Sequence, residues 1–323
     1  MLTRLSFRAI SSLTGILPRR WQYALARPLS DVFCLAARGK RRCVMANLRP
    51  VLGEGASDAE IHRNTRAIFR SFGAYLCEFF GFEQLGARFI DSHVEVRGRE
   101  NIEAALRLGR GAILCSGHYS NWELGACVVA RLGYPITAVF QMQADARTNE
   151  MFVEQRARAG VTVVHTQHGA RAALRALRQN QTVALMGDRL TGGPTIGIKL
   201  FGREVRFPLG PWRIANVSGA ALLPVFIHRE PEGRFILDIG FAIECAGETP
   251  AERIAALAQG WAGCLEERLK SDPAQWAAFY NVWETQDEQL LNAPRIGQAS
   301  VRRIHGEPIA ENQSQRTTSR AGN

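Results

Sequence analysis

The chain has 323 residues, of which 46% are hydrophobic, and it carries a formal net charge of +10. A chain of this length and apolar content can bury a large core, which predicts one α/β domain, with or without appendages. Its seven cysteines are scattered and form no Cys-x-x-Cys pair, a pattern that indicates reduced thiols in a cytosolic setting.

The excess positive charge is concentrated at the N-terminal end. Residues 1–50 contain ten Lys and Arg side chains against the single carboxylate of Asp31. Such a distribution suits an anionic surface, either a membrane or a nucleic acid, and the apolar residues between the arginines favour a membrane. We therefore expect a membrane surface, and no nucleic acid, as a partner of this segment.

The same segment is predicted to lie on a membrane rather than to cross it. Apolar residues recur at helical spacing in 2–17, and a second apolar run covers 29–37. Both runs are shorter than the ~20 residues that span a bilayer, and no convincing signal-peptide cleavage site follows. We assign 1–40 to a basic amphipathic segment that associates with the membrane. A helix that packs on the core with a solvated basic face is the alternative.

The next elements are predicted to be helices. The sequence Ser57-Asp-Ala-Glu60 is a capping box, which predicts a helix from 59 to 71, and an apolar and aromatic stretch continues to Phe82. We expect these helices to cover one face of a sheet and to form part of a lipid-facing groove, although a plain core helix explains the aromatic residues equally well.

A possible catalytic turn follows the strand-like run at 112–115. Ser116 and Gly117 end this run, and 122–130 has the length and apolar content of a helix. His118 would then lie where the carboxyl end of a buried parallel strand meets a helix, the usual ligand crevice of open α/β sheets. A histidine there can take a proton from an attacking hydroxyl, because the ordinary pKa of histidine lies near neutrality.

Glu123 is the expected carboxylate partner of His118. Side chains five residues apart do not meet within one straight helix, so the contact requires His118 on the turn and Glu123 on the first helical turn. A helix-capping histidine beside a solvated glutamate is the alternative. Cys115 also borders the turn, but its place within an apolar strand predicts a buried and unreactive thiol.

Further α/β elements are predicted between this turn and the next informative stretch. We expect a strand at 134–140, a helix at 151–160 and another strand from Val161. The spacing of His165 and His168 could place both on one helix face, as in a metal site, but no third ligand lies near them in the sequence. Two surface histidines and no metal are therefore expected.

A second strand end carries charge. The strand predicted at 181–187 leads into Asp188 and Arg189, followed by a glycine-rich loop. The loop lacks the lysine of a P-loop, because Ile198 follows Gly197, so nucleotide binding is not predicted. A local salt bridge is one role for the charged pair.

The C-terminal third completes the predicted domain. A strand at 235–240 is expected at an edge of the sheet, and Pro250 opens a helix that runs to about Lys270. The polar composition beyond Glu284 predicts a disordered tail at 285–323.

Several of these stretches resemble the lipid A biosynthesis (lauroyl/myristoyl) acyltransferase family, part of the wider lysophospholipid and glycerolipid acyltransferases. That family carries a His-x4-Asp/Glu motif, commonly within Gly-Asn-Trp-Glu, and here Ser120 stands in place of the glycine. The family's other elements follow in order: Arg-x-x-x-Gly at 156–160, Pro-x-Gly-Pro at 208–211, Pro-Val-Phe at 224–226 and Pro-x-x-Trp at 273–276. The resemblance covers about residues 40–283.

The resemblance implies a fold as well. It is an α/β fold with a central, mostly parallel sheet flanked by helices, as in the glycerolipid acyltransferases, preceded by an N-terminal amphipathic helical segment. The acyltransferase domain would occupy 41–284. Relatives often have one membrane-spanning helix near the N-terminus.

The activity that the resemblance implies is O-acyl transfer. A fatty acyl group would move from acyl carrier protein or acyl-CoA to a hydroxyl of a membrane glycolipid resembling a lipid A precursor, at the cytoplasmic face of the bacterial inner membrane. No cofactor is implied. Lysophospholipid or phosphatidylinositol-mannoside acyl transfer is the alternative. A nonenzymatic membrane- or nucleic-acid-binding protein would explain the basic N-terminus, but it would not explain why His118 and Asp188 lie at strand ends.

The resemblance also assigns residues. His118 would act as general base with Glu123 orienting it, and backbone N–H groups near the turn would stabilise the oxyanion. Substrate binding is assigned to four residues: Asn121, Trp122, Asp188 and Arg189. Among these, Asp188 would position a sugar hydroxyl and Arg189 a phosphate or carboxylate.

Overall fold

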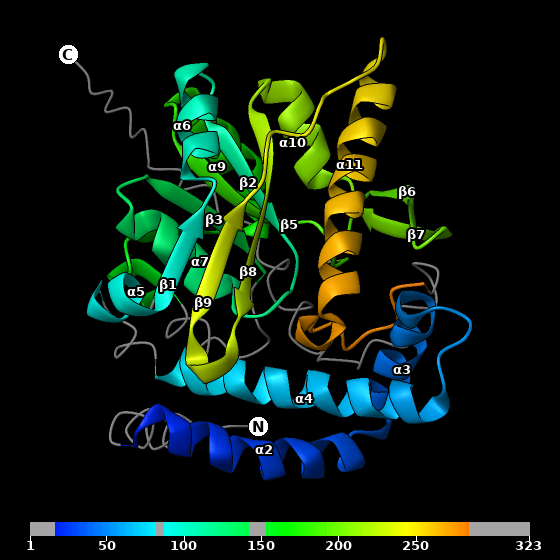
Figure 1. Ribbon diagram of the computed structural model, residues 1–323. Helices are drawn as coiled ribbons and strands as arrows, with labels where there is room; N and C mark the ends of the chain where they lie inside the picture. The colour runs from blue at the N-terminus through cyan, green and yellow to red at the C-terminus, as the bar shows by residue number, and fades with distance from the viewer. Residues whose placement is uncertain (1–16, 82–86, 142–152, 155, 191, 284–323) are drawn as a thin grey trace, which may run out of the picture. The chain divides into compact units, whose positions relative to one another are not determined.

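A seven-stranded sheet forms the centre of the computed structural model (Figure 1). Its strands follow in the order β1-β9-β8-β2-β5-β3-β4, and all neighbours are parallel except β8 and β9. The strands are β1 Val94–Arg97, β2 Ala112–Ser116, β3 Ile136–Phe140, β4 Val161–His165, β5 Thr182–Met186, β8 Ala221–Arg229 and β9 Phe235–Ile239. The predicted α/β fold with a mostly parallel sheet is confirmed. The expectation that 235–240 forms an edge strand is wrong, because β9 lies between β1 and β8.

The structure describes residues 17–81, 87–141, 153–154, 156–190 and 192–283. The helix predicted at 2–17 lies outside these residues except for Leu17, and the tail at 285–323 lies outside them entirely. The helix predicted at 151–160 is only partly included.

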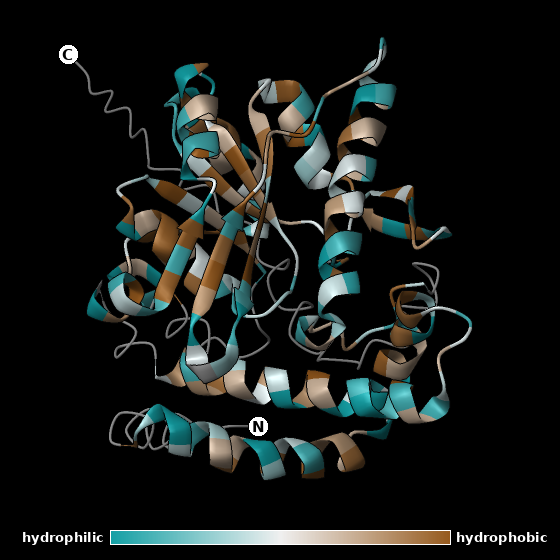
Figure 2. Cartoon of the chain, in the orientation of Figure 1, coloured by the Kyte–Doolittle hydropathy of each residue, from teal (hydrophilic) through white to brown (hydrophobic). Residues whose placement is uncertain are grey.

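Helices cover both faces of the sheet because the strands are apolar on both sides. β2 and β8 consist almost wholly of buried residues, as expected of parallel strands covered on each face, and Figure 2 shows the hydrophobic colour running along the strands. The helices packed on one face are α5 Ala87–His93, α6 Arg99–Arg107 and α7 Trp122–Arg131. Those on the other face are α9 Thr166–Arg178, α10 Gly210–Ser218 and α11 Pro250–Ser271.

Smaller elements complete this side of the molecule. An antiparallel ribbon of β6 Thr195–Leu200 and β7 Arg203–Pro208 packs beside α11. The helix α11 begins with a full capping box between Thr249 and Glu252, and it ends close to the predicted boundary.

Three helices precede the sheet: α2 Arg19–Ala36, α3 Arg38–Leu52 and α4 Asp58–Phe80. They share a core of their own, which includes Val44, Leu48, Ile61 and Phe69, and α2 lies alongside α4 (Figure 1). The Ser57 side chain accepts the N–H of Glu60, as the capping pattern predicted. The helix predicted at 59–71 and the helical stretch predicted after it form one element, α4, which ends at Phe80. No described helix is both long and apolar enough to cross a bilayer.

Candidate active site

The register between β2 and β5 brings His118 and Asp188 together. Ser116 at the end of β2 is paired with Met186 at the end of β5, so both strands end at the same level. Two residues further along the chain, β2 is followed by His118 and β5 by Asp188. The His118 Nδ1 atom lies 2.8 Å from Asp188 Oδ1, and the His118 backbone N–H donates to Asp188 Oδ2 over 2.8 Å. An imidazole and a carboxylate from residues 70 positions apart therefore form one pair.

The carboxylate of Asp188 is enclosed by the groups that bind it. Its residue is only 1% exposed, and Oδ2 also accepts the indole N–H of Trp276 over 3.2 Å. Burial acts to raise the pKa of Asp188, but the charge of His118 and the hydrogen bonds from His118 and Trp276 outweigh it and hold the pKa below its ordinary value. Asp188 therefore stays ionised at neutral pH and accepts the Nδ1 proton.

The position of Asp188 differs from the one expected of a residue that binds a sugar hydroxyl. Its carboxylate lies buried behind the imidazole and hydrogen-bonds to His118. The sequence did place Asp188 at the end of a predicted strand. It did not show that this strand, β5, lies next to β2, because local sequence patterns do not give the order of strands in a sheet.

The prediction that Glu123 is the partner of His118 is wrong. The two oxygens of Glu123 accept from Arg156, at 2.8 Å from Nε and 2.6 Å from Nη2. Both side chains are largely buried. Glu123 thus joins the start of α7 to the Arg156 segment that precedes β4, by a charge-assisted bidentate pair.

The side chain of Asn121 is used in contacts within the protein. It is fully buried; its side-chain oxygen accepts the N–H of Leu124 and so caps α7, and its amide group donates to Glu78 over 2.8 Å. The predicted contact of Asn121 with substrate is therefore not supported by its surroundings.

Trp122 and Arg189 are placed differently. The Trp122 ring lies edge-on to the His118 ring at 4.9 Å and stacks on Tyr75, so it fixes one side of the imidazole. Arg189 is exposed, with its guanidinium 5.8 Å from the centre of the Tyr280 ring. Of the four predicted substrate-binding residues, these two remain placed where a ligand could reach them.

The backbone of the turn is itself engaged. A Cβ on Gly117 would lie 3.3 Å from Asp188 Oδ2, so glycine lets the carboxylate approach the turn. The N–H groups of His118, Tyr119 and Ser120 donate to Asp188, Gly117 and Gln275 respectively. These three N–H groups of the turn are therefore not free to stabilise an oxyanion.

A thiolate mechanism finds no support at Cys115. The residue is fully buried in β2, and burial raises the pKa of its thiol well above the ordinary value. The prediction of an unreactive thiol is consistent with this environment.

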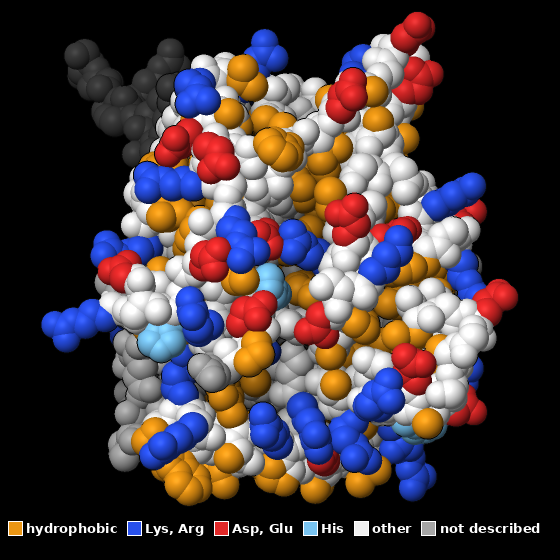
Figure 3. All heavy atoms as spheres, in the orientation of Figure 1, with side chains coloured by type: hydrophobic (Ala, Val, Ile, Leu, Met, Phe, Trp, Pro, Cys, Tyr) orange, Lys and Arg blue, Asp and Glu red, His pale blue; other side chains and the backbone are white. Residues whose placement is uncertain are grey.

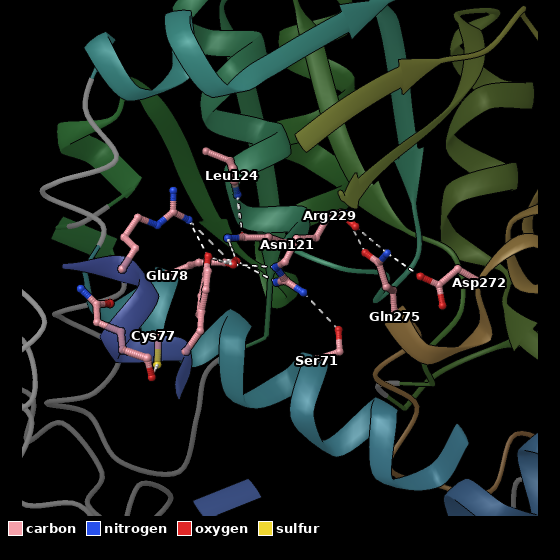
Figure 4. Close-up of polar contacts among 11 residues, drawn as sticks. Ser71, Cys77, Glu78, Asn121, Leu124, Arg229, Asp272 and Gln275 are labelled. Atoms are coloured by element: carbon pink, nitrogen blue, oxygen red, sulfur yellow. Dashed lines mark hydrogen bonds and ion pairs between the residues drawn. The ribbon is translucent and has the colours of Figure 1, made fainter. Parts of the chain in front are cut away.

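A buried charge network behind the turn was not predicted (Figure 4). The carboxylate of Glu78 on α4 has no exposed surface, and it accepts from Arg229 at the end of β8 over 2.7 and 2.8 Å. Glu78 also accepts from Asn121 and from the hydroxyl of Tyr23. The network therefore ties α2, α4, β8 and the cap of α7 together. A glutamate amid aromatic residues in a predicted core helix was the signal that sequence reasoning missed.

Gln275 extends the network to the C-terminal segment. Its side chain accepts the N–H of Arg229 and donates to the Arg229 carbonyl and to Asp272, while its own carbonyl accepts the N–H of Ser120 (Figure 4). Gln275 thus links the His118 turn to the backbone of β8.

Replacing Arg229 with lysine should measure the contribution of this network. Arg229→Lys keeps the charge but cannot form the two parallel hydrogen bonds to Glu78, so we expect the free energy of unfolding to fall by about 2 kcal/mol. Chemical denaturation measures the change. Arg234→Lys, at an exposed position beside β9, is the control and should stay within about 0.5 kcal/mol of the wild type. Equal midpoints for the three proteins would contradict a structural role for the pair.

Comparison with known proteins finds similar sequences among acyltransferases. The chain is 28% identical to phosphatidylinositol mannoside acyltransferases from two strains of Mycobacterium tuberculosis over 224 residues, which is 67% of this chain and 69% of those proteins. It is 26% identical to the phosphatidylinositol mannoside acyltransferase of Mycolicibacterium smegmatis over 276 residues, 81% of this chain and 88% of that protein. The model of the bacterial lipid A biosynthesis acyltransferase family matches residues 7–285, which include the whole described sheet, the His118 turn and Asp188. The chain belongs to the bacterial lipid A biosynthesis acyltransferase family.

Proposed function

We propose that this acyltransferase moves a fatty acyl group from a thioester donor to a hydroxyl of a membrane glycolipid, with His118 as general base. The observation that supports this proposal is the His118–Asp188 pair at the ends of β2 and β5. The donor is acyl carrier protein or acyl-CoA, and no cofactor takes part.

In this mechanism Asp188 accepts the Nδ1 proton and so leaves the Nε2 lone pair free. Nε2 makes no hydrogen bond to any residue in the described part of the chain. As the acceptor hydroxyl attacks the thioester carbon, its proton passes to Nε2, and the imidazolium is stabilised by the Asp188 carboxylate. The C–S bond then breaks, the thiolate takes the proton from the imidazolium, and the ester and free thiol leave.

The oxyanion requires donors other than the turn. The first two N–H groups of α7, those of Trp122 and Glu123, donate to no group among the described residues. The positive end of the α7 dipole also favours negative charge there. We assign these amides to the oxyanion of the tetrahedral intermediate.

The acceptor and the location follow from the family. A lipid A precursor-like glycolipid at the cytoplasmic face of the bacterial inner membrane is the proposed acceptor, with residues 1–40 associating with the membrane and 41–284 forming the acyltransferase domain. Similarity to three phosphatidylinositol mannoside acyltransferases favours a second candidate, a phosphatidylinositol-mannoside-like glycolipid. Lysophospholipid is a third acceptor to be compared.

An acceptor panel tests the proposal. Purified enzyme is supplied with acyl-CoA or acyl carrier protein carrying an isotopically labelled chain, and each of the three lipid classes is offered in detergent. Mass spectrometry should find the label as an ester on one glycolipid class, and the His118→Ala protein should not form it at a comparable rate. Thioester hydrolysis without any labelled lipid would contradict the proposal.

A further inference from the structure

The helix α2 has an apolar face that no described residue covers. Its packing face toward α4 carries Gln22, Ala26, Ser30 and Cys34. Along one side of this packing face, large apolar side chains recur every three or four residues: Trp21, Leu25, Leu29 and Val32, which are 55%, 51%, 69% and 63% exposed. Apolar surface gathered in this way marks a contact with another apolar phase.

The other flank of the packing face is basic. Arg20 and Arg27 lie seven residues apart, about two helical turns, and therefore share one side of α2. Both are exposed, and neither forms an ion pair within the described ranges. Figure 3 shows Lys and Arg side chains in a row along the lower part of the molecule, where α2 and α4 lie, with apolar side chains beneath them. This combination is typical of a helix that lies in the interface of an anionic bilayer.

A pocket of about 610 Å³ opens beside the basic flank, between α2, α4 and the turn from β8 to β9. Guanidinium groups from three elements line it: Arg19, Arg20 and Arg27 of α2, Arg70 of α4 and Arg229 of β8. We name it the α2 pocket.

Most of these charges are balanced, but two are not. Arg229 is paired with Glu78, Arg19 lies 3.9 Å from the same carboxylate, and Arg70 forms a bidentate pair with Asp31. The single described carboxylate in the lining, that of Glu230, hydrogen-bonds to His228. The positive charges of Arg20 and Arg27 therefore remain available to a ligand, which must be an anion.

We propose that the α2 pocket binds the phosphate of an anionic lipid headgroup while the apolar face of α2 lies in the bilayer. Guanidinium forks match phosphate oxygens in geometry and charge. The Trp21 side of α2 would lie at the level of the acyl chains and the Arg20 side at the level of the phosphates, which places the pocket mouth among headgroups. The inference rests on the proposed association of residues 1–40 with the membrane and deepens it, because it names the lipid group that α2 would bind.

Vesicle binding tests the pocket with the full chain. Wild-type protein is titrated with phosphatidylcholine vesicles containing phosphatidylglycerol, and bound protein is measured by flotation. The double variant Arg20→Ala/Arg27→Ala should bind about thirtyfold more weakly, the effect expected of two basic residues at an anionic surface. The control Arg171→Ala/Arg178→Ala removes the same charge from exposed positions of α9 and should change binding less than twofold. Equal losses in the two double variants, or no loss, would overturn the proposal.

A soluble phosphate compound is the competing occupant of the pocket. Millimolar inorganic phosphate should raise the melting temperature of the lipid-free wild type by no more than it raises that of Arg20→Ala/Arg27→Ala. A stabilisation of the wild type that the variant lacks would identify a soluble ligand and contradict the lipid.

A separate pair of substitutions tests the apolar face of α2. Leu25→Ser/Leu29→Ser should weaken vesicle binding more than tenfold with little change in melting temperature or oligomeric state. A lowered melting temperature or an altered oligomeric state with unchanged vesicle binding would mean that another part of the chain or a second copy covers the face, and the proposal would fall. His118→Ala should bind vesicles as the wild type does, so loss of catalysis and loss of membrane binding are separate results.

Discussion

His118→Ala is expected to lower kcat by roughly 10²–10⁴-fold, the usual contribution of a general base. The imidazole is the group that would receive the acceptor proton, and among the described residues no other titratable side chain hydrogen-bonds to the Asp188 carboxylate. The loss should appear in kcat, since binding of the lipid and the thioester does not depend on the proton transfer. Single-turnover measurements with saturating donor and acceptor isolate this step.

The fold of this variant should persist. The His118 backbone N–H still binds Asp188 Oδ2, but Oδ1 loses its donor, so the free energy of unfolding should fall by about 1–3 kcal/mol. Activity is therefore measured well below the melting temperature. His168→Ala, at an exposed position on α9, is the control and should keep full activity. A His118→Ala enzyme that turns over at the wild-type rate would contradict the general-base role.

Asp188→Asn should cost nearly as much activity as removing the imidazole. Asp188 Oδ2 accepts two N–H donors, from the His118 backbone and the Trp276 ring. The amide oxygen of asparagine must take this position, which turns the NH₂ group toward Nδ1 of His118. Nδ1 then becomes an acceptor and the ring proton moves to Nε2, which removes the free lone pair. We expect kcat to fall by roughly 10²–10⁴-fold.

Glu123→Gln is the matched control, because it makes the same change in a neighbouring carboxylate that pairs with Arg156. It should lower stability while leaving kcat within about tenfold, well short of the ~10²-fold or greater loss of a missing base. If Glu123→Gln has a lower kcat than Asp188→Asn, Glu123 is the functional partner of His118, as the His-x4-Glu spacing predicted, and the role given to Asp188 is wrong.

The pH dependence of stability gives a second test of the ionised state of Asp188. Because its pKa is lower in the folded protein than its ordinary value, near 4, its ionised form contributes stability at neutral pH. That contribution declines as the pH falls below about 4 and is lost below the folded-state pKa. Asp188→Asn should therefore be less stable than the wild type at pH 7, and the difference should shrink on acidification. Denaturation curves across this range measure it.

Patterns within short stretches of sequence determined much of the fold. Apolar runs ended by glycine or polar residues predicted β2 and β5, a capping box predicted the start of α4, and Pro250 predicted the start of α11. The same patterns placed His118 and Asp188 each at the carboxyl end of a strand. These features depend on neighbours a few residues apart, whose preferences the local sequence carries.

The tertiary structure alone decided which charged groups meet. His118 and Glu123 share a motif, yet the imidazole binds Asp188 because β5 lies next to β2 in register, and Glu123 binds Arg156 instead. The contact of Glu78 with Arg229 spans 151 residues. Such contacts depend on strand order and on which buried charge needs a partner, and both are settled only when distant segments pack together, because a charge left unpaired in the core is costly.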